Sequence, residues 1–566
     1  MSRREKRTEK QSNKTFRKLL IVALFLICVL VVLKYAYNYV RKDVTDKTNL
    51  IINNSNVTTS LKQDVLVENG VIYIAKEDIA NFFDSYIYYD KKYNQIITGS
   101  DTKIAAIVIG EKKMTNNGST VNIPATVIEK NDSYYIPFSS LNDIYHIKIE
   151  YIEETNTVVV DSLDRKFVVA DSSKNNSIKQ ERTVVSRTVD RVEKGDNLVI
   201  VNDSNKDGWI KVRTSRGKLG YVKENTITNL TTVRENLEEE KQITENVSLI
   251  WEYFSEYGSA PSRTGKLQGV NVVSPTFFTL KRLGKGEIQE NVGDSGKAYI
   301  AWAHEQGYKV WPSLSNNSMI DTTSEIMNDY QLRQNLINRI VSLVVKYDLD
   351  GINIDFEYMY AKDKQLFSRF IIELAPRLKE FGKVLSVDVT APDGSENWSG
   401  CYDRHTIGKV ADYIVFMGYD QNSSGKVGTS AGCDWVEVNL QKFVGTQEEV
   451  DSKKIILGMP FYTRICYTTS SGENKALRVG MNELDKYIPS NAKKVWDDNL
   501  KQNVAEYTKN GIKYKAWIED EASLKAKFDL VNKYDLAGAA YWKKGFEVND
   551  IWDMISNKLG IELDRL

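Results

Sequence analysis

The chain has 566 residues, of which 42% are hydrophobic and 27% are charged. At roughly 150 residues per domain this length predicts three or four units, and it leaves room for one barrel of about 250 residues or more. Basic and acidic residues number 76 each, so the formal net charge of zero provides no electrostatic reason to expect a nucleic-acid partner. A neutral or mixed-charge substrate fits this composition better.

The cysteines and histidines do not have the spacing of a metal site. Three histidines show no ligand spacing, and the cysteines lack the paired spacing of a zinc site. The cysteines are Cys28, Cys401, Cys433 and Cys466. Because Cys28 lies in an apolar N-terminal run, the other three leave room for one disulfide, and free half-buried thiols are the favoured alternative. We expect no metal and no cofactor.

The N-terminus has the pattern of a membrane anchor. Residues 1–18 form a basic tail, and an uncharged apolar run follows from Leu19 to Leu33. A cleaved signal peptide is the alternative, but no A-x-A-like site follows and three tyrosines resemble an interfacial belt. We therefore predict an uncleaved transmembrane helix over residues 19–40, with the basic tail in the cytoplasm and the remainder outside the cell, as in a Gram-positive-type bacterium.

Two small modules are predicted next. Residues 41–60 are polar and predict a linker. A weak repeat of 62 residues, each copy a strand, a short helix and a hairpin, predicts an α+β domain over residues 61–165. Starting at Val71-Ile-Tyr-Ile and again at Ser133-Tyr-Tyr-Ile, it resembles amine-oxidase N-terminal-like stalk domains of bacterial surface proteins. That resemblance implies a spacer and no catalysis.

Short strands broken by Gly and Asp turns predict a small all-β barrel over residues 180–228. Gly208-Trp209 and Gly220-Tyr-Val222 resemble bacterial SH3-like domains, which implies binding of wall peptides. For Trp209, core packing is at least as good an interpretation as ligand contact. Residues 229–244 are charged and predict a second linker.

From residue 245 the pattern changes to apolar strands separated by amphipathic stretches, which is typical of parallel βα units. Eight units in about 320 residues predict an α/β fold, a (β/α)₈ TIM barrel over residues 245–566. Residues 467–518 predict a small α+β insertion beside the cleft. The eight strands are expected at Val247–Trp251, Val270–Ser274, Lys309–Leu314, Gly351–Glu357, Val384–Thr390, Tyr413–Tyr419, Ile455–Phe461 and Ala537–Trp542.

The fourth predicted strand ends in acids. Asn353, Asp355 and Glu357 are two residues apart, so strand alternation points all three into the barrel. Such groups are costly in an apolar interior unless they perform chemistry, and a structural ion network is the alternative. Asp355 next to Glu357 increases the proton affinity of Glu357, which suits it to act as a general acid.

The run Asp350-Gly-Ile-Asn-Ile-Asp-Phe-Glu357 resembles the signature of family-18 glycoside hydrolases, the chitinase and endo-β-N-acetylglucosaminidase family. Met417-Gly-Tyr-Asp420 resembles the family's motif on strand six, and Trp542 stands where the family has an aromatic residue on strand eight. Further segments, including Cys401-Tyr-Asp-Arg, resemble the subgroup that contains spore cortex-lytic N-acetylglucosaminidases.

The resemblance implies a retaining mechanism in which the acetamido oxygen of the substrate attacks the anomeric carbon. Glu357 would be the acid, Asp355 and Tyr419 would hold the acetamido group, and Trp542 would form the floor under the sugar. Asn353, Met417 and Asp420 would complete the substrate-binding set. One departure is Asn353, because the family often has Asp there, and this changes how protons move among the acids.

The leading hypothesis is an active hydrolase that cleaves after N-acetylglucosamine in peptidoglycan or spore cortex. Chitin contains the same sugar and is an alternative substrate. A non-catalytic wall-binding lectin is an alternative from another class, which the presence of Glu357 disfavours. Exo and endo action both fit the sequence, as do sporulating and vegetative roles.

Overall fold

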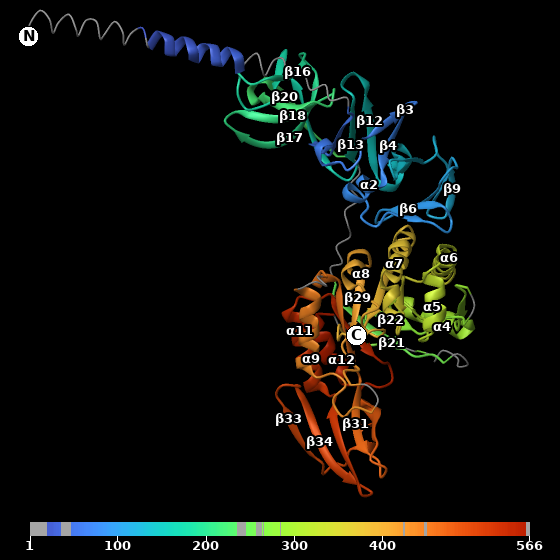
Figure 1. Ribbon diagram of the computed structural model, residues 1–566. Coiled ribbons are helices and arrows are strands. Elements are labelled where there is room, and N and C mark those ends of the chain that lie inside the picture. The colour runs from blue at the N-terminus through green and yellow to red at the C-terminus, as the bar shows by residue number, and fades with distance from the viewer. Residues whose placement is uncertain are drawn as a thin grey trace, which may run out of the picture. The chain divides into compact units, whose positions relative to one another are not determined.

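The computed structural model describes residues 18, 20–34, 47–234, 245–255, 263, 265–282, 285–422, 425–445 and 450–561. Figure 1 labels its helices and strands. The chain divides into two compact units on either side of residue 240, and two short segments, Asp90–Tyr93 and Gly99–Ala105, are grouped with the second unit. The first unit contains the α+β and all-β modules, and the second contains the barrel.

Residues 20–34 form a helix whose apolar side chains are exposed, for example Phe25 at 67% and Leu30 at 64%. Within the described part of the chain, no helix has both the length and the hydropathy of a membrane span. Of the predicted anchor over residues 19–40, residue 19 and residues 35–40 lie outside the described residues, as does the basic tail apart from Lys18.

The α+β module contains two copies of a strand, a short helix and a hairpin, so the predicted repeat is confirmed. The two copies meet where β4 pairs with β11 in antiparallel register, Tyr73 opposite Pro137. The first copy is β4 (Val71–Ala75), α2 (Lys76–Phe82), β5 (Tyr88–Asp90) and β6 (Gln95–Gly99), and the second is β11 (Ser133–Pro137), α3 (Asn142–Tyr145), β12 (Ile147–Ile152) and β13 (Thr157–Ser162). The other strands are β1 (Asn49–Ile52), β2 (Ser55–Asn56), β3 (Leu66–Glu68), β7 (Ile104–Val108), β8 (Lys113–Asn116), β9 (Ser119–Asn122) and β10 (Ile128–Lys130).

Strand β1 corrects the predicted linker over residues 41–60. It pairs in parallel with β13, Leu50 opposite Val158, and Leu50 and Ile51 are 0% and 2% exposed. The tether prediction is therefore wrong from Asn49 onward. The strand is only four residues long and its partner lies far along the chain, so local composition does not reveal it.

The all-β module is one seven-stranded sheet in the order β16-β15-β19-β18-β17-β14-β20. It extends beyond the predicted range of 180–228 at both ends, because β14 begins at Lys166 and β20 takes residues 229–234 of the predicted second linker. Trp209 is 8% exposed, as core packing requires. The strands are β14 (Lys166–Ser172), β15 (Asn176–Lys179), β16 (Thr188–Val192), β17 (Asn197–Lys206), β18 (Trp209–Thr214), β19 (Leu219–Lys223) and β20 (Ile227–Arg234).

All eight predicted barrel strands are present, and their parallel pairing closes into a ring. The third is split into β25 (Lys309–Val310), which pairs with β22, and β26 (Ser313–Ser315), which pairs with β27. Closure occurs between β36 and β21, where a Cβ at Gly538 would overlap the carbonyl oxygen of Val247. The remaining strands are β21 (Val247–Glu252), β22 (Val272–Pro275), β27 (Gly351–Asp355), β28 (Val384–Val389), β29 (Tyr413–Met417), β30 (Ile455–Pro460) and β36 (Gly538–Trp542). A short hairpin, β23 (Phe278–Leu280) and β24 (Ile288–Glu290), extends the sheet beside β26.

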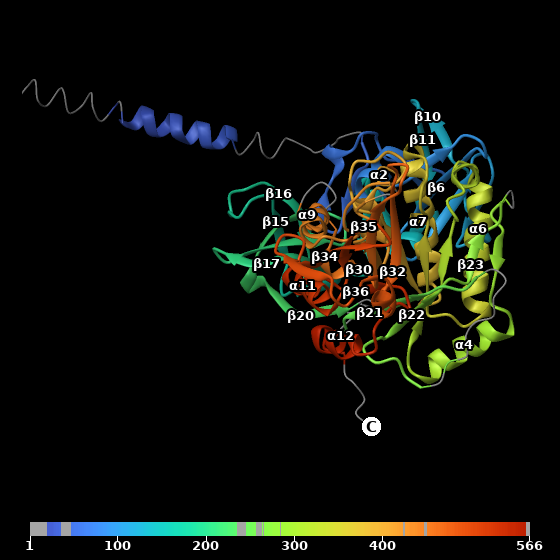
Figure 2. The same cartoon turned by 90° about the horizontal axis from the view of Figure 1, so that it is seen from below.

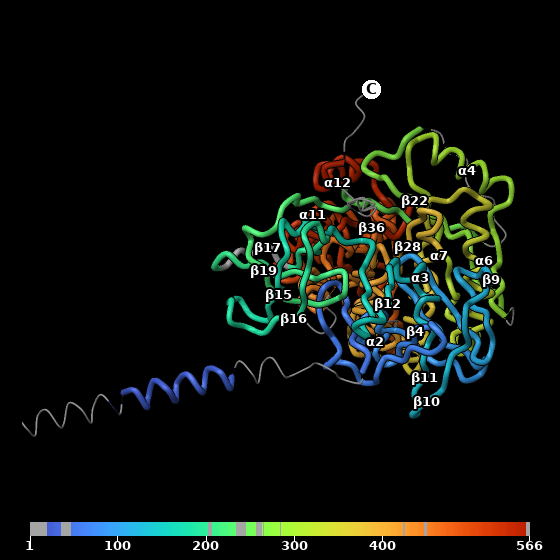
Figure 3. Tube along the Cα trace, turned by 90° about the horizontal axis from the view of Figure 1, so that it is seen from above, coloured from blue at the N-terminus to red at the C-terminus, as the bar shows by residue number. Residues whose placement is uncertain are grey.

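Helices surround the ring, as Figure 2 and Figure 3 show from opposite sides. Each buries an apolar face on the strands: α6, capped by the Asp329 side chain, buries Leu336 and Ile340, and both are at most 1% exposed. The helices are α4 (Gly293–Glu305), α5 (Ile320–Met327), α6 (Tyr330–Lys346), α7 (Lys364–Lys379), α8 (Arg404–Val410), α9 (Cys433–Val444), α11 (Glu521–Lys533) and α12 (Ile551–Leu559).

The predicted insertion is a five-stranded antiparallel sheet in the order β32-β31-β35-β34-β33. It follows β30 directly and extends to one side of the barrel (Figure 1). Its elements are β31 (Tyr462–Thr468), β32 (Asn474–Gly480), α10 (Leu484–Tyr487), β33 (Lys493–Asp497), β34 (Gln502–Lys509) and β35 (Ile512–Ile518). The four cysteines are free, so the structure contains no disulfide among Cys401, Cys433 and Cys466.

Candidate active site

The two acids of strand four lie at its carboxyl end. Strand β27 ends at Asp355, so Glu357 lies in the loop that follows and not on the strand as predicted. Asn316, which follows β26, fixes this loop: its Oδ1 accepts from the Glu357 amide at 3.0 Å, and its Nδ2 donates to the Glu357 carbonyl at 3.0 Å. At the start of the strand, a Cβ on Gly351 would lie 2.5 Å from the carbonyl oxygen of Val384. Only glycine therefore allows β27 to pack this closely against β28.

Burial sets the proton affinities of the two acids. It raises the pKa of Asp355 to about 6, an effect that a hydrogen bond from Glu357 partly opposes. Burial also raises the pKa of Glu357 to about 9, and the charges of Asp355 and Asp420 add to it while Arg478 opposes it. The sequence predicts the Asp355 charge as the cause, whereas burial is the larger one. At neutral pH the pair therefore carries a proton on Glu357 and a charge on Asp355.

Asn353 lies two residues before Asp355 on β27, farther from the carboxyl end of the strand, and is fully buried. Its Oδ1 accepts from Trp251 Nε1 at 3.0 Å, and its Nδ2 donates to Ser386 Oγ at 3.0 Å and to Asp388 Oδ1 at 2.7 Å. Asp388, on β28, is a third buried acid that the sequence reading missed. Burial raises its pKa well above the usual range, and the charges of Asp355 and Glu357 add to this.

Strand β29 ends at Met417, so Tyr419 lies in the loop that follows and not on the strand as predicted, and Asp420 lies in the same loop. Burial raises the pKa of the Tyr419 hydroxyl well above its usual value, which keeps the hydroxyl a donor. Asp420 is held by two residues of the insertion: Tyr462 donates to it at 2.6 Å, and Arg478 pairs with it at 3.0 Å.

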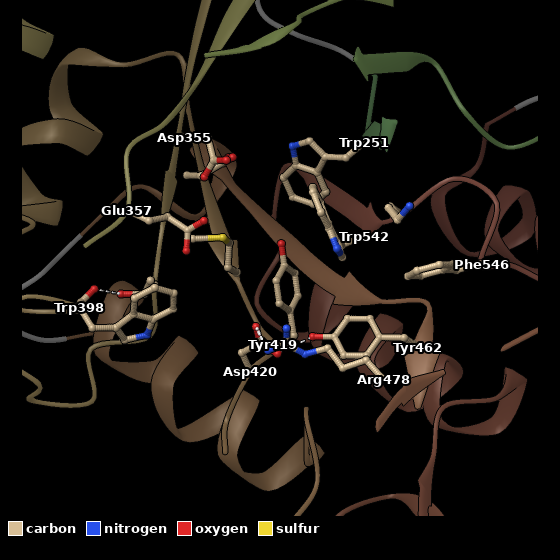
Figure 4. A pocket seen from close by; sticks show the side chains of 14 residues that line it. Trp251, Asp355, Glu357, Trp398, Tyr419, Asp420, Tyr462, Arg478, Trp542 and Phe546 are labelled. Atoms are coloured by element: carbon tan, nitrogen blue, oxygen red, sulfur yellow. Dashed lines mark hydrogen bonds and ion pairs between the residues drawn. The ribbon is translucent and has the colours of Figure 1, made fainter. Parts of the chain in front are cut away.

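These groups surround one cavity of about 310 Å³. Figure 4 shows Asp355 and Glu357 on one side, Trp251 and Trp542 on the other, and Tyr419 pointing between them. Six of the seven predicted residues line it, and Asn353 lies beneath. The lining residues are Trp251, Asp355, Glu357, Asp388, Thr390, Trp398, Met417, Tyr419, Asp420, Tyr462, Arg478, Trp542, Lys543 and Phe546.

Several of these residues were not predicted. Asp388 carries a signal in the sequence, because Ser386 and Asp388 on β28, and Thr390 directly after it, repeat the two-residue spacing of polar side chains seen on strand four. Tyr462 and Arg478 carry no such signal in the sequence. They reach the cavity because the insertion folds beside it.

Comparison with known proteins identifies the barrel. Residues 249–547, more than half of the chain, match the sequence model of the glycosyl hydrolases family 18. The chain belongs to this family. The family-18 resemblance of the sequence is thus confirmed, and the chain is a glycoside hydrolase. Residues 43–160 match the copper amine oxidase N-terminal domain, in agreement with the predicted stalk module.

The family-18 barrel has relatives among bacterial glycosylases. The uncharacterized glycosylase YvbX of Bacillus subtilis is 28% identical over 298 residues, which cover 50% of this chain and 84% of that protein. The cortical fragment-lytic enzyme of Bacillus subtilis is 24% identical over 257 residues, which cover 44% of this chain and 59% of that enzyme. The crystal structure of the Bacillus cereus spore cortex-lytic enzyme SleL has a TM-score of 0.48 and 19% identity, covering 60% of this chain and 79% of that one.

Proposed function

We propose that this family-18 enzyme cleaves β-1,4 bonds after N-acetylglucosamine in cell-wall peptidoglycan, with retention of configuration. The observation that carries the proposal is that Glu357 and Asp355 lie together in a tryptophan-lined cavity, where burial raises the pKa of both carboxyls and that of Glu357 more. A neutral, positioned carboxylic acid is the group that protonates a leaving glycosidic oxygen.

The reaction proceeds in two steps. Glu357 donates its proton to the glycosidic oxygen, and the acetamido oxygen of the substrate attacks the anomeric carbon as the glycosidic bond breaks. Asp355 stabilises the positive charge that forms on the acetamido group, and Tyr419 donates to its oxygen. Glu357, now a carboxylate, removes a proton from the water that attacks the anomeric carbon. The ring that the acetamido group formed with the anomeric carbon opens, the acetamido group is restored, and Glu357 is protonated again.

The substrate is argued from the cavity walls and from the relatives. Two cations line the cavity: Arg478, which is paired with Asp420, and Lys543, whose Nζ lies 4.5 Å from the ring centroid of Phe546. Peptidoglycan carries carboxylates next to its N-acetylglucosamine, whereas chitin is neutral. The related cortical fragment-lytic enzyme is named for cortex fragments. We therefore place wall or cortex peptidoglycan ahead of chitin.

The proposal is tested by incubating the purified chain with vegetative wall, spore cortex and chitin oligomers, and identifying new reducing ends by mass spectrometry. Reducing-end N-acetylglucosamine from wall or cortex, lost in Glu357→Gln, is the expected result. Glu325→Gln on the exposed face of α5 is the matched control and should retain activity. Cleavage of chitin alone would show a chitinase. Sugar binding without cleavage would show a lectin and overturn the proposal.

We also propose that the chain is anchored in the cell membrane, with its N-terminus in the cytoplasm and its modules outside. Support comes from the basic tail over residues 1–18 and from the exposed apolar side chains of the helix over residues 20–34. In this arrangement the α+β module is a spacer and the all-β module an SH3-like contact with wall peptides. Protease added to intact protoplasts should remove the barrel. A protected barrel would contradict this topology.

A further inference from the structure

Two neighbouring barrel strands place polar side chains side by side in the interior. Strands β27 and β28 are in parallel register, with Asn353 opposite Ser386. Strand alternation then places Asp355 and Asp388 on the same inner face. Asn353 is 0% exposed and Asp388 is 2% exposed. The catalytic acids are thus part of a polar cluster that spans two strands.

The amide at position 353 has no donor hydrogen left. Its oxygen accepts from Trp251, and the two hydrogens of its nitrogen go to Ser386 and Asp388. An amide cannot take up or release a proton near neutral pH. A proton that Asp355 shares with a neighbour on the side of Asn353 must therefore be held by a group other than Asn353.

Asp388 is the carboxyl placed to hold it. Asp388 lines the same cavity as Asp355 and Glu357, so three buried carboxyls share one volume. Among the described residues, Asp355 Oδ1 is buried and has no hydrogen-bond partner. Three carboxylates cannot all be ionised at such close range without a large electrostatic cost. The groups that face Asp388 are Asp355, Glu357 and Tyr419, and the side-chain amide of Asn353 donates a hydrogen bond to it.

We propose that Asp388 is a positioning residue that holds a proton throughout the catalytic cycle and so replaces an acid at position 353. The inference rests on the proposed hydrolytic function. In the resting state Asp388 and Glu357 are protonated and Asp355 is charged. When Glu357 transfers its proton to the leaving oxygen, the neutral Asp388 limits the cluster to two negative charges opposite the developing positive charge. Water then returns a proton to Glu357, and the proton of Asp388 is not consumed.

The kinetic test compares Asp388→Asn with the exchange variant Asn353→Asp/Asp388→Asn, which moves the acid back to strand β27. Because an amide is neutral and has the shape of a protonated carboxyl, we expect Asp388→Asn to lower kcat less than about ten-fold and to leave both limbs of the pH profile in place, whereas removal of an ionised acid would displace them. The exchange variant should keep the same limbs, because its acid at position 353 then holds the proton. Asp412→Asn is the control, an exposed acid outside the cavity whose Oδ2 accepts from the Leu385 amide. It should affect stability and leave the pH profile unchanged.

A spectroscopic test separates this inference from the proposed function. In the Glu357→Gln background, the infrared spectrum at neutral pH should contain the C=O stretch of a protonated carboxylic acid, and this band should disappear in Glu357→Gln/Asp388→Asn. The measurement needs no turnover, so it stands even if no substrate is cleaved. If Asp388→Asn does not fold, the exchange variant, which retains the buried acid, carries the kinetic test. An ionised Asp388, or a displaced pH profile in Asp388→Asn, would overturn the proposal.

Discussion

At the scale of single residues, Asp355 and Glu357 share one cavity and yet differ in pKa. Burial raises the pKa of Asp355 to about 6 and that of Glu357 to about 9. The proposed reaction needs Asp355 ionised and Glu357 protonated. We therefore expect kcat/KM to rise as the pH passes about 6 and to fall as it passes about 9, with both limbs belonging to the coupled pair. Initial rates of wall digestion across this range would check the profile. An acid limb that lies well below pH 6 would contradict it.

The same environment makes Glu357 a burden on stability. Its pKa is raised on folding from 4.5 to about 9, so the folded state binds a proton that the unfolded state releases. Stability is therefore unaffected below about pH 4.5 and falls as the pH rises toward 9. Replacement by Gln should remove this penalty and stabilise the barrel by about 1–3 kcal/mol at pH 8. Calorimetry of both proteins at pH 4 and pH 8 would detect this gain in stability. An equal gain at both pH values would rule out titration of Glu357 as the cause.

At the scale of elements, the insertion between β30 and α11 completes the site. Arg478 on β32 pairs with Asp420 at 3.0 Å, and its charge lowers the pKa of Glu357. In Arg478→Gln we expect Asp420 to lose its ion pair, which should raise KM several-fold. The pKa of Glu357 should increase further, so the alkaline limb of kcat/KM should move to higher pH.

Lys475 offers a matched control on the same strand. It pairs with Glu473 at 3.4 Å, is 49% exposed and does not line the cavity. Lys475→Gln removes one positive charge from β32, as Arg478→Gln does, and should change neither KM nor the alkaline limb. Equal effects of the two substitutions would show that the insertion acts through its overall charge and not through Arg478.

At the scale of the whole molecule, a buried ion pair joins the two modules of the first unit. Arg213 of the all-β module donates two hydrogen bonds, of 2.7 and 2.6 Å, to Asp161 of the α+β module. The side chains are 8% and 19% exposed. Asp161→Asn leaves a buried guanidinium without its charge partner, which should destabilise this unit by about 1–3 kcal/mol. Calorimetry would show one transition at lower temperature while wall-digesting activity persists.

Asp64→Asn is the control for this prediction. Asp64 pairs with Lys47 at 2.8 Å, but the two side chains are 54% and 61% exposed, so the pair contributes little. This substitution should leave both transitions in place. A loss of wall-digesting activity in Asp161→Asn would mean that the two units do not work independently.

The sequence by itself determined the barrel and the two acids at the end of strand four. Continuous apolar strands at eight places, and polar side chains two apart on strand four, are local patterns that follow from strand alternation. Asp355 and Glu357 were predicted from the end of strand four, and Tyr419, Met417, Asp420 and Trp542 from the family-18 resemblance. The structure places all six around one cavity.

Only the tertiary structure decided which distant side chains join them and which strands pair across long separations. Strand β1 needs β13 to be recognised, and Tyr462 and Arg478 reach the cavity through the folding of the insertion. Asp388 acquires its role because β28 lies in register with β27, which brings its carboxyl to the amide of Asn353. The magnitudes of the pKa shifts also came from the fold, since burial, their largest cause, depends on every element that closes the cavity.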